Sequence, residues 1–385
     1  MKIALVSPYD FAHPGGVPNH ITWLEYYLTR MGNEVKIIAP ASKEVSTFGD
    51  RFIPIGKPRP IPSSGSIIRI PVSLHLAPTI KAVLAREKFD IIHLHEPFMP
   101  MLCSAVLRFS NTVTVGTFHA ADGRPGYNWG RPISTWMIRG RLKHLHGKIA
   151  VSEPAMKYHS RYIPGPYEII PNGVDTRRFS PYVEPLEEYN DGKKKVLFLG
   201  RLETRKGLKY LVRAMEQVKR EVPDTRLLIV GPGTRLRGKY EKQVSKAGLD
   251  GDVKFIGFIP EMDKPKYFKT ADVYCSPATG RESQGIVLLE SMAVGTPVVA
   301  SSIAGYASVV TNGEEGLLTP PKDSDSLARA IITLLKDDDL RKRMGEKGRA
   351  TSANYSWDSV SQRVYDFYEK TINEVKQRAA GGKSN

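Results

Sequence analysis

Cysteine is nearly absent from this sequence of 385 residues, which contains only Cys103 and Cys275. Apolar or small residues flank each of them, and neither belongs to the paired spacing of a zinc site or a disulfide framework. Because disulfides are characteristic of oxidising compartments, this composition favours a cytoplasmic protein.

Long hydrophobic runs are absent as well, since no stretch approaches the roughly 20 apolar residues that span a bilayer. Residues 1–6 are apolar for the length of one strand, and the chain turns polar at Ser7, which excludes the hydrophobic region of a secretory signal. We therefore expect any contact with a membrane to be peripheral.

Acidic residues are outnumbered, with 40 Asp and Glu against 56 Lys and Arg and a formal net charge of +16. Such an excess suits binding to nucleic acid, to an anionic membrane surface or to small phosphorylated substrates. An ordinary solvated basic surface without a charged partner is an alternative explanation. The basic residues are scattered through both halves and no recognised nucleic-acid-binding module is present. We expect no nucleic-acid partner, although a basic nucleic-acid-binding protein remains a distant alternative.

The length and the 41% apolar content predict about two domains. Short β-branched runs alternate with helical patterns, which indicates parallel sheets in an α/β architecture. The predicted strands are residues 3–6, 35–39, 91–95, 112–117, 149–151 and 169–170, then 196–199, 226–230, 253–256, 273–276 and 297–300. We place the domains at residues 1–175 and 176–356, with a terminal helix at about 357–378 that packs back on the first.

Parallel sheets bind ligands beyond the carboxyl ends of their strands. After the first strand come Gly15 and Gly16, ahead of a helix expected to begin near Asn19, where backbone amides favour an anion. A plain turn explains the two glycines equally well. Their spacing is not G-x-G-x-x-G, which argues against a dinucleotide-binding dehydrogenase.

Two stretches in the second half place charged residues at strand ends. Arg201 and Lys206 lie between Gly200 and Gly207, directly after a predicted strand, and suit a diphosphate unless they form a solvated basic loop. Glu282 lies in a loop after the strand 273–276. Glu290 follows inside an otherwise apolar helix that is expected to begin near residues 284–285, where an ionised carboxylate needs partners unless it faces the surface.

Histidines follow two strands of the first half. His119 comes directly after residues 112–117 and is suited to contact a substrate or transfer a proton, although a lone histidine is more often structural. Alternation puts His93 and His95 on one face of their strand. The sequence offers them no third metal ligand, so we interpret this segment as a strand end and not as a zinc centre.

Taken together, these segments resemble the family-4 glycosyltransferases over nearly the whole chain. The matching motifs are Pro14-Gly15-Gly16-Val17, His119, Pro171-Asn172-Gly173-Val174-Asp175, Gly200-Arg201 with Lys206-Gly207, Val230-Gly231-Pro232-Gly233, and the pair Glu282 and Glu290. Within the family the chain is most similar to the phosphatidylinositol mannosyltransferases, on residues 7–9, 94–97, 149–152, 271–275 and 282–287 among others.

The resemblance implies the GT-B fold, in which two Rossmann-like, doubly wound domains face each other across a cleft. It also implies roles for particular residues. The implied donor-binding residues are Gly16, Arg201, Lys206, Gly233, Glu282, Ser283, Gly285, Ile286 and Glu290, with Glu282 on the sugar and Glu290 on the ribose. The implied acceptor-binding residues are Tyr9, Ser66, Arg69 and His119. Catalysis would depend on His119, Arg201, Lys206 and Glu282.

The implied reaction is the transfer of mannose from GDP-mannose to phosphatidylinositol, with retention of configuration and without a metal or other cofactor. No Asp-x-Asp motif occurs in a plausible place, and Arg201, Lys206 and the helix start near Gly285 would stabilise the departing diphosphate. A protein on the inner face of the cell membrane follows from such an acceptor.

Other acceptors and donors stay open at this point. Pro18, Phe98 and His13 depart from the family pattern on the acceptor side, and residues 79–88 carry few basic side chains. Another lipid, a small molecule or a polysaccharide is therefore an alternative acceptor, and a UDP-sugar an alternative donor. Residues 136–146 mix aromatic, aliphatic and basic side chains as an interfacial helix does, or as a partly buried helix with a basic face does.

Overall fold

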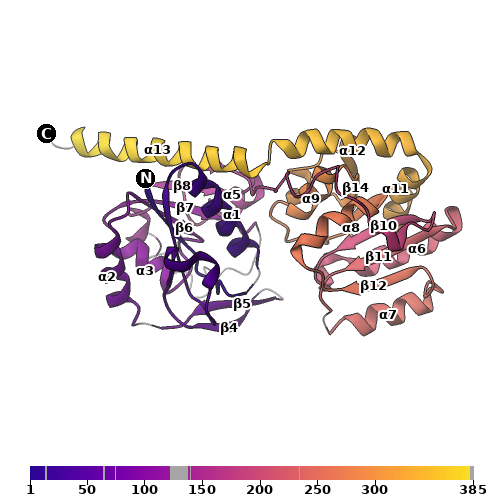
Figure 1. Cartoon of the computed structure of the whole chain (residues 1–385), viewed down its shortest axis with the longest axis horizontal. Coiled ribbons are helices and arrows are strands. Elements are labelled where there is room, and N and C mark those ends of the chain that lie inside the picture. The colour runs from indigo at the N-terminus through magenta and orange to yellow at the C-terminus, as the bar shows by residue number, and fades with distance from the viewer. Residues whose placement is uncertain are drawn as a thin grey trace. The chain divides into compact units, whose positions relative to one another are not determined.

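The structure is a computed structural model that describes residues 1–13, 15–63, 66–73, 75–121, 138, 140–233 and 235–381. The chain divides into two compact units (Figure 1). Unit 1 comprises residues 1–172 and 357–385, and unit 2 comprises residues 173–356. The prediction of two parallel-sheet α/β domains is confirmed, and the predicted boundary after residue 175 lies close to this division.

Unit 1 is built on a parallel sheet with the strand order β3-β2-β1-β6-β7-β8-β9. These strands are β1 Lys2–Val6, β2 Glu34–Ala39, β3 Phe52–Pro54, β6 Ile91–His95, β7 Val113–Phe118, β8 Gly147–Ala150 and β9 Glu168–Ile169. The antiparallel hairpin of β4 Pro58–Ser63 and β5 Ser66–Pro71 stands apart from the sheet. The helices are α1 Gly16–Arg30, α2 Ala77–Glu87, α3 Leu102–Phe109, α5 Glu153–His159 and α13 Trp357–Gly381, with a short 3-10 helix η1 at Ser46–Arg51.

Strand β1 shows why helices cover both faces of this sheet. Ile3 and Leu5 point into a core shared with α1 and α13, whereas Ala4 and Val6 point into a second core shared with α2 and α3. This alternation is typical of a strand that is buried on both faces of a parallel sheet. The apolar periodicity of the sequence therefore fixes α1 and α13 on one side and α2 and α3 on the other.

Unit 2 repeats the architecture with the strand order β12-β11-β10-β13-β14-β15. Its strands are β10 Lys194–Leu199, β11 Thr225–Val230, β12 Val253–Gly257, β13 Val273–Ser276, β14 Val298–Ser301 and β15 Gly316–Thr319. Its helices are α6 Leu208–Glu221, α7 Arg237–Lys246, α8 Lys264–Thr270, α9 Ile286–Val294, α10 Ala304–Ala307, α11 Ser324–Lys336 and α12 Asp338–Ala353, with the 3-10 helices η3 Glu187–Tyr189, η4 Thr204–Lys206 and η5 Glu261–Asp263. Among the described residues, no helix is long and apolar enough to cross a membrane.

Helix α13 follows unit 2 in the chain but belongs to unit 1, where it packs against α1 (Figure 1). A buried hydrogen-bonded chain fastens it to the sheet. The Tyr368 hydroxyl lies 2.6 Å from His93 Nδ1, and His93 Nε2 lies 2.6 Å from Thr117 Oγ1. Tyr368 and His93 are fully buried, so neither side chain can exchange its partner for water.

Replacing Tyr368 with phenylalanine should therefore lower the free energy of unfolding by about 1–3 kcal/mol, because it leaves His93 Nδ1 buried without a partner. Tyr365→Phe is the matched control, since Tyr365 lies on the same helix and is only partly buried. Urea denaturation of the full chain measures both. Equal midpoints for the two variants would show that the Tyr368 hydroxyl does not fasten the helix.

Candidate active site

The residues predicted from the second half of the chain gather at the topological switch point of unit 2. Strands β10 and β13 are neighbours there. From β10 the strand order runs through β11 and β12 to one edge of the sheet, and from β13 it runs through β14 and β15 to the other edge. The loop after β10 carries Arg201 and Lys206, and the loop after β13 carries Glu282. An open α/β sheet binds its ligand in the crevice outside such a pair of strands.

Glu282 is held by two cations of the loop after β10. Its Oε1 lies 2.8 Å from Lys206 Nζ and 2.5 Å from Arg205 Nη1. Arg205 also pairs with Glu203 at 2.8 Å, and Glu203 lies 3.4 Å from the guanidinium of Arg201. The side chain of Arg201 is 57% exposed, which leaves it accessible to a ligand, whereas Glu282 is only 14% exposed.

The two loops are also joined through their backbones. The Arg205 carbonyl accepts hydrogen bonds from the Thr279 amide at 2.8 Å and from the Thr279 hydroxyl at 3.2 Å. Gly207 has φ 75°, and a Cβ at this position would lie 1.8 Å from the Pro277 carbonyl oxygen. Only glycine permits this approach, so the contact between Glu282 and its cations depends on Gly207.

Helix α9 begins at Ile286, directly after Ser283, Gln284 and Gly285. The first amides of a helix lack acceptors within the helix and carry the positive end of its dipole. The predicted helix start near residues 284–285 is close to the observed one. The amide groups at the start of α9 therefore follow Glu282 by only a few residues and are suited to a phosphate.

Glu290 lies on α9 and is buried, so the surface-facing alternative for this residue is wrong. Burial raises the pKa of its carboxyl group, and Lys264 on α8 opposes this shift from 3.9 Å. Among the described residues, Glu290 Oε2 has no hydrogen-bond partner. A buried carboxylate oxygen that lacks a partner is costly, and ligand hydroxyl groups would satisfy it.

The isosteric change Glu290→Gln should keep or increase stability. It should weaken binding of the sugar nucleotide that the resemblance implies about tenfold, through the loss of charge-assisted hydrogen bonds. The pKa of Glu290 is raised by folding, so its carboxyl group favours the folded state at low pH, and this contribution is lost as the pH rises through the folded pKa. The free energy of unfolding should therefore fall less with pH in the variant than in the parent protein. Urea titrations from acidic to neutral pH, with exposed Glu241→Gln as control, measure this; identical pH profiles would contradict it.

Gly233 lies in the loop between β11 and α7 and is exposed. The same loop touches the loop after β10, because a Cβ at Gly231, which has φ 142°, would lie 2.0 Å from the Gly200 carbonyl oxygen. Gly233 therefore follows by two residues the point where Gly231 contacts Gly200, the residue before Arg201. A Cβ at Gly233 would lie 3.4 Å from the Arg237 side chain.

Gly16, which the resemblance assigns to the donor, and the residues that it assigns to the acceptor all lie in unit 1. Gly16 is the first residue of α1, three residues earlier than predicted, because Pro18 is tolerated in the first turn of a helix. Tyr9 is half-buried in the loop after β1, and the adjacent Asp10 amide donates to the Arg69 carbonyl at 2.9 Å. Ser66 begins β5, and its side chain lies outside the described residues.

His119 follows β7 and is held in place by Glu96, a residue that sequence reasoning missed. Glu96 Oε1 accepts the amides of His119 at 2.8 Å and Ala120 at 3.1 Å. Burial raises the pKa of Glu96 to about 7, although the two amide bonds oppose the shift. Glu96 also adopts φ 54°, an uncommon conformation for a residue other than glycine, at the end of β6.

Three further histidines surround His119 or stack near it. The rings of His93 and His95 stack at 4.3 Å, which confirms that they share one face of β6. His95 Nδ1 lies 3.0 Å from His119 Nε2, and His20 of α1 packs against both rings. Among the described residues, the group of side chains close enough to hold an ion is His20, His95 and His119, and it does not include His93. His20 approaches from a helix whose tertiary packing the sequence does not reveal.

The segments considered for membrane contact are only partly visible. Trp136, Met137 and Arg139 lie outside the described residues. Ile138 and Leu145 are buried in the core of unit 1, which favours a partly buried helix for the described part. On α2, the Lys81 ammonium lies 4.7 Å from the centre of the Phe109 ring.

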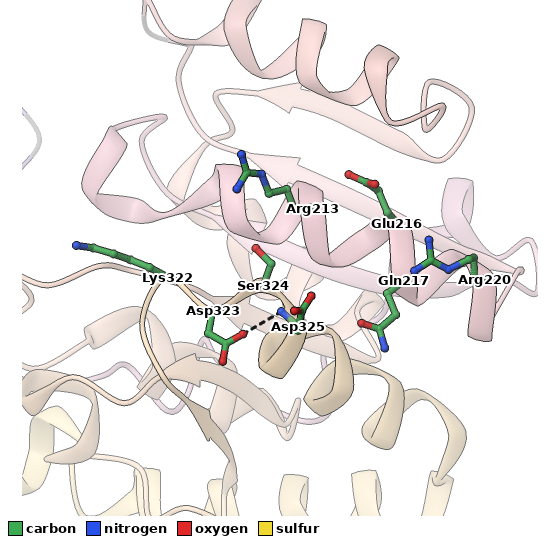
Figure 2. A pocket seen from close by; sticks show the side chains of 8 residues that line it. All are labelled: Arg213, Glu216, Gln217, Arg220, Lys322, Asp323, Ser324 and Asp325. Carbon is green, nitrogen blue, oxygen red and sulfur yellow. Dashed lines mark hydrogen bonds between the residues drawn. The ribbon is translucent and has the colours of Figure 1, made fainter.

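A groove of about 680 Å³ lies elsewhere in unit 2, between α6 and the start of α11 (Figure 2). It contains none of the predicted site residues. Its lining combines three cationic with three acidic side chains and two neutral ones: Arg213, Arg220, Lys322, Glu216, Asp323, Asp325, Gln217 and Ser324. This balance of charge does not select a ligand class.

Comparisons with known proteins agree with this division of the chain. Residues 14–178 match the model of Glycosyltransferase Family 4, and residues 185–351 match that of Glycosyl transferases group 1. The chain is 36% identical over 375 residues to the phosphatidyl-myo-inositol mannosyltransferase of Mycolicibacterium smegmatis, covering 96% of this chain and 94% of that protein.

A second relative is the GDP-mannose-dependent monoacylated alpha-(1-6)-phosphatidylinositol monomannoside mannosyltransferase of Corynebacterium glutamicum. It is 35% identical over 221 residues, which cover 53% of this chain and 56% of that one. Among solved structures, sucrose-phosphate synthase from Thermosynechococcus elongatus superposes with a TM-score of 0.76 at 24% identity, over 97% of this chain and 99% of that one. This likeness confirms the predicted GT-B fold.

Proposed function

The chain belongs to glycosyltransferase family 4, and from this premise we propose that it transfers mannose from GDP-mannose to phosphatidylinositol. The observation that carries the donor half is the convergence of Arg205 and Lys206 on Glu282, ahead of the start of α9. This arrangement provides cations and helix amides for a diphosphate together with a carboxylate for sugar hydroxyls. The acceptor half rests on the Mycolicibacterium smegmatis relative, whose name specifies phosphatidyl-myo-inositol, while the Corynebacterium glutamicum relative is named for GDP-mannose and a phosphatidylinositol monomannoside.

The proposed reaction retains the configuration of the anomeric carbon. The bond from this carbon to the β-phosphate oxygen breaks, and GDP leaves as the acceptor oxygen forms its new bond on the same face. The acceptor's proton passes to the departing phosphate. A covalent route through Glu282 is disfavoured, because Arg205 and Lys206 engage its carboxylate and reduce its nucleophilicity.

Stabilisation of the leaving group is proposed to depend on protein cations and not on a divalent metal. Lys206 supplies a mobile charge, Arg201 an exposed guanidinium, and the start of α9 supplies backbone amides. Preorganised groups of this kind stabilise charge where it develops in the transition state. For the membrane acceptor we propose peripheral attachment at the inner face, favoured by the attraction between a net charge of +16 and anionic lipids.

A GDP donor is supported by the acidic group beside Glu290. Lys264 lies 3.9 Å from Glu290 and 2.8 Å from Glu261, so the two carboxylates share one cation. We propose that the ribose of the nucleoside meets Glu290 and that its base contacts Glu261. One edge of guanine presents two adjacent N–H donors, N1–H and N2–H, and a carboxylate can accept both of them. Uracil presents only one N–H donor between two carbonyl groups.

A thermal-shift screen of GDP, GDP-mannose, UDP and UDP-glucose tests the donor, because a ligand that binds only the folded state raises its melting temperature. We expect the guanine nucleotides to raise the melting temperature and the uracil nucleotides to have little effect. Glu261→Gln should reduce the shift with GDP, whereas Glu241→Gln should leave it unchanged. A larger shift with UDP than with GDP would refute the proposed donor.

A further inference from the structure

Three imidazole rings of unit 1 form a compact cluster from three different elements. His20 comes from α1, His95 ends β6, and His119 follows β7. The ring centres are 4.9 Å apart for His20 and His119, 5.2 Å for His20 and His95, and 5.3 Å for His95 and His119. One nitrogen of each ring lies within 4.8 Å of the other two.

These spacings match three ligands of one tetrahedral ion. An imidazole bound at a Zn–N distance of about 2.0 Å has its ring centre about 3.2 Å from the ion, so rings at tetrahedral angles are about 5.2 Å apart. The three observed ring separations scatter around this value. The nitrogens of such a site are about 3.3 Å apart. One nitrogen of each ring already lies within 4.8 Å of the others, and His95 Nδ1 and His119 Nε2 face each other in a hydrogen bond at 3.0 Å, so all three rings turn toward an ion that binds between them.

Some ring nitrogens of the cluster have no hydrogen-bond partner among the described residues. Only one proton fits between His95 Nδ1 and His119 Nε2, which are 3.0 Å apart. Among the described residues, the buried His20 Nδ1 and His95 Nε2 have no partner.

We propose that His20, His95 and His119 form a binding site for a divalent transition ion of the Zn²⁺ type, with a fourth position open to water. Three neutral imidazoles suit Zn²⁺, Co²⁺ or Ni²⁺, whereas Mg²⁺ and Ca²⁺ prefer oxygen ligands. The surroundings fix the ligands. His93 stacks on His95 at 4.3 Å and is itself held by Tyr368 and Thr117, while Glu96 holds the backbone of His119.

The site has a consequence that rests on the proposed function. Zn²⁺ would occupy a lone pair of His119, a residue on which catalysis is expected to depend, so Zn²⁺ would inhibit the transferase and a chelator would restore it. The proposed site differs from a catalytic metal site at the diphosphate in two ways. Its ligands belong to unit 1, and they are nitrogen ligands, whereas Mg²⁺ prefers oxygen.

The test is a titration of the full chain with Co²⁺, followed by visible absorption. We expect one Co²⁺ per chain with the intense bands of a tetrahedral complex, displaced by one equivalent of Zn²⁺ and unaffected by excess Mg²⁺. His119→Gln and His95→Gln should each weaken binding at least about 100-fold, more than the loss of an outer-shell partner does. The matched control His75→Gln, at an exposed histidine of unit 1, should leave binding unchanged.

Equal Co²⁺ binding by the parent protein, His119→Gln and His75→Gln would overturn the site, as would the absence of tetrahedral bands. His119 is only half-buried, so its variant remains informative if the buried His95→Gln fails to fold. Zn²⁺ should also raise the melting temperature of the parent protein and not that of His119→Gln. Histidine-dependent Zn²⁺ binding with undiminished mannose transfer would keep the metal site and refute the catalytic role of His119.

Discussion

Replacing Lys206 with alanine should lower kcat by at least about 100-fold, because removal of one preorganised group at the developing charge costs about this much. The affinity for GDP should fall about 10- to 100-fold as well, through the loss of a charge-assisted hydrogen bond. Both effects follow from the position of Lys206, whose ammonium lies 2.8 Å from Glu282 beyond the carboxyl ends of β10 and β13. Initial rates with GDP-mannose and calorimetric titration with GDP measure the two quantities.

Lys209→Ala is the matched control for this change. Lys209 lies one turn away on α6, and its ammonium rests over the Tyr210 ring at 4.6 Å. We expect this variant to retain the parent rate and GDP affinity. A similar loss in both variants would mean that general positive charge, and not the position of Lys206, supports the reaction.

Glu282→Gln should separate binding of the diphosphate from transfer of the sugar. Glutamine loses the charge that Arg205 and Lys206 now neutralise, so both cations become available to phosphate. GDP should therefore bind as tightly as to the parent protein or more tightly. Mannose transfer should nevertheless fall on the order of 100-fold, because the donor sugar loses a charged partner in the transition state.

The control for Glu282→Gln is Glu221→Gln, at an exposed residue that pairs with Lys336 at the end of α6. It should change neither GDP affinity nor turnover. If Glu282→Gln weakens GDP binding in parallel with transfer, Glu282 only holds the two cations in place. That result would remove it from contact with the sugar.

Much of this site is predictable from the sequence because its residues follow strands directly. In a parallel sheet the carboxyl ends of the strands lie along one edge, so residues that follow strands belong to one site, and the structure brings Lys206 and Glu282 together although 76 positions separate them. Glu290 was expected to need partners because its helical neighbours are apolar, and the structure buries it beside Lys264. These inferences use only local patterns and one rule of sheet topology.

Other features depend on tertiary packing that no local pattern contains. The sequence predicts Arg201 as the arginine of the site. In the structure, Arg205 of the short helix η4 contacts Glu282. His20 joins the histidine cluster only because α1 lies across the ends of β6 and β7. The hairpin β4–β5 was missed because its prolines argue against strands, and such residues are tolerated outside a central sheet.

The most direct test of the proposed function is mass spectrometry of the lipid after the full chain is incubated with GDP-mannose and phosphatidylinositol vesicles in the presence of EDTA. We predict a product heavier than phosphatidylinositol by one hexose, formed together with GDP and cleaved by an α-mannosidase. Consumption of a UDP-sugar in place of GDP-mannose, or an unmodified phosphatidylinositol while another acceptor gains the sugar, would contradict the account.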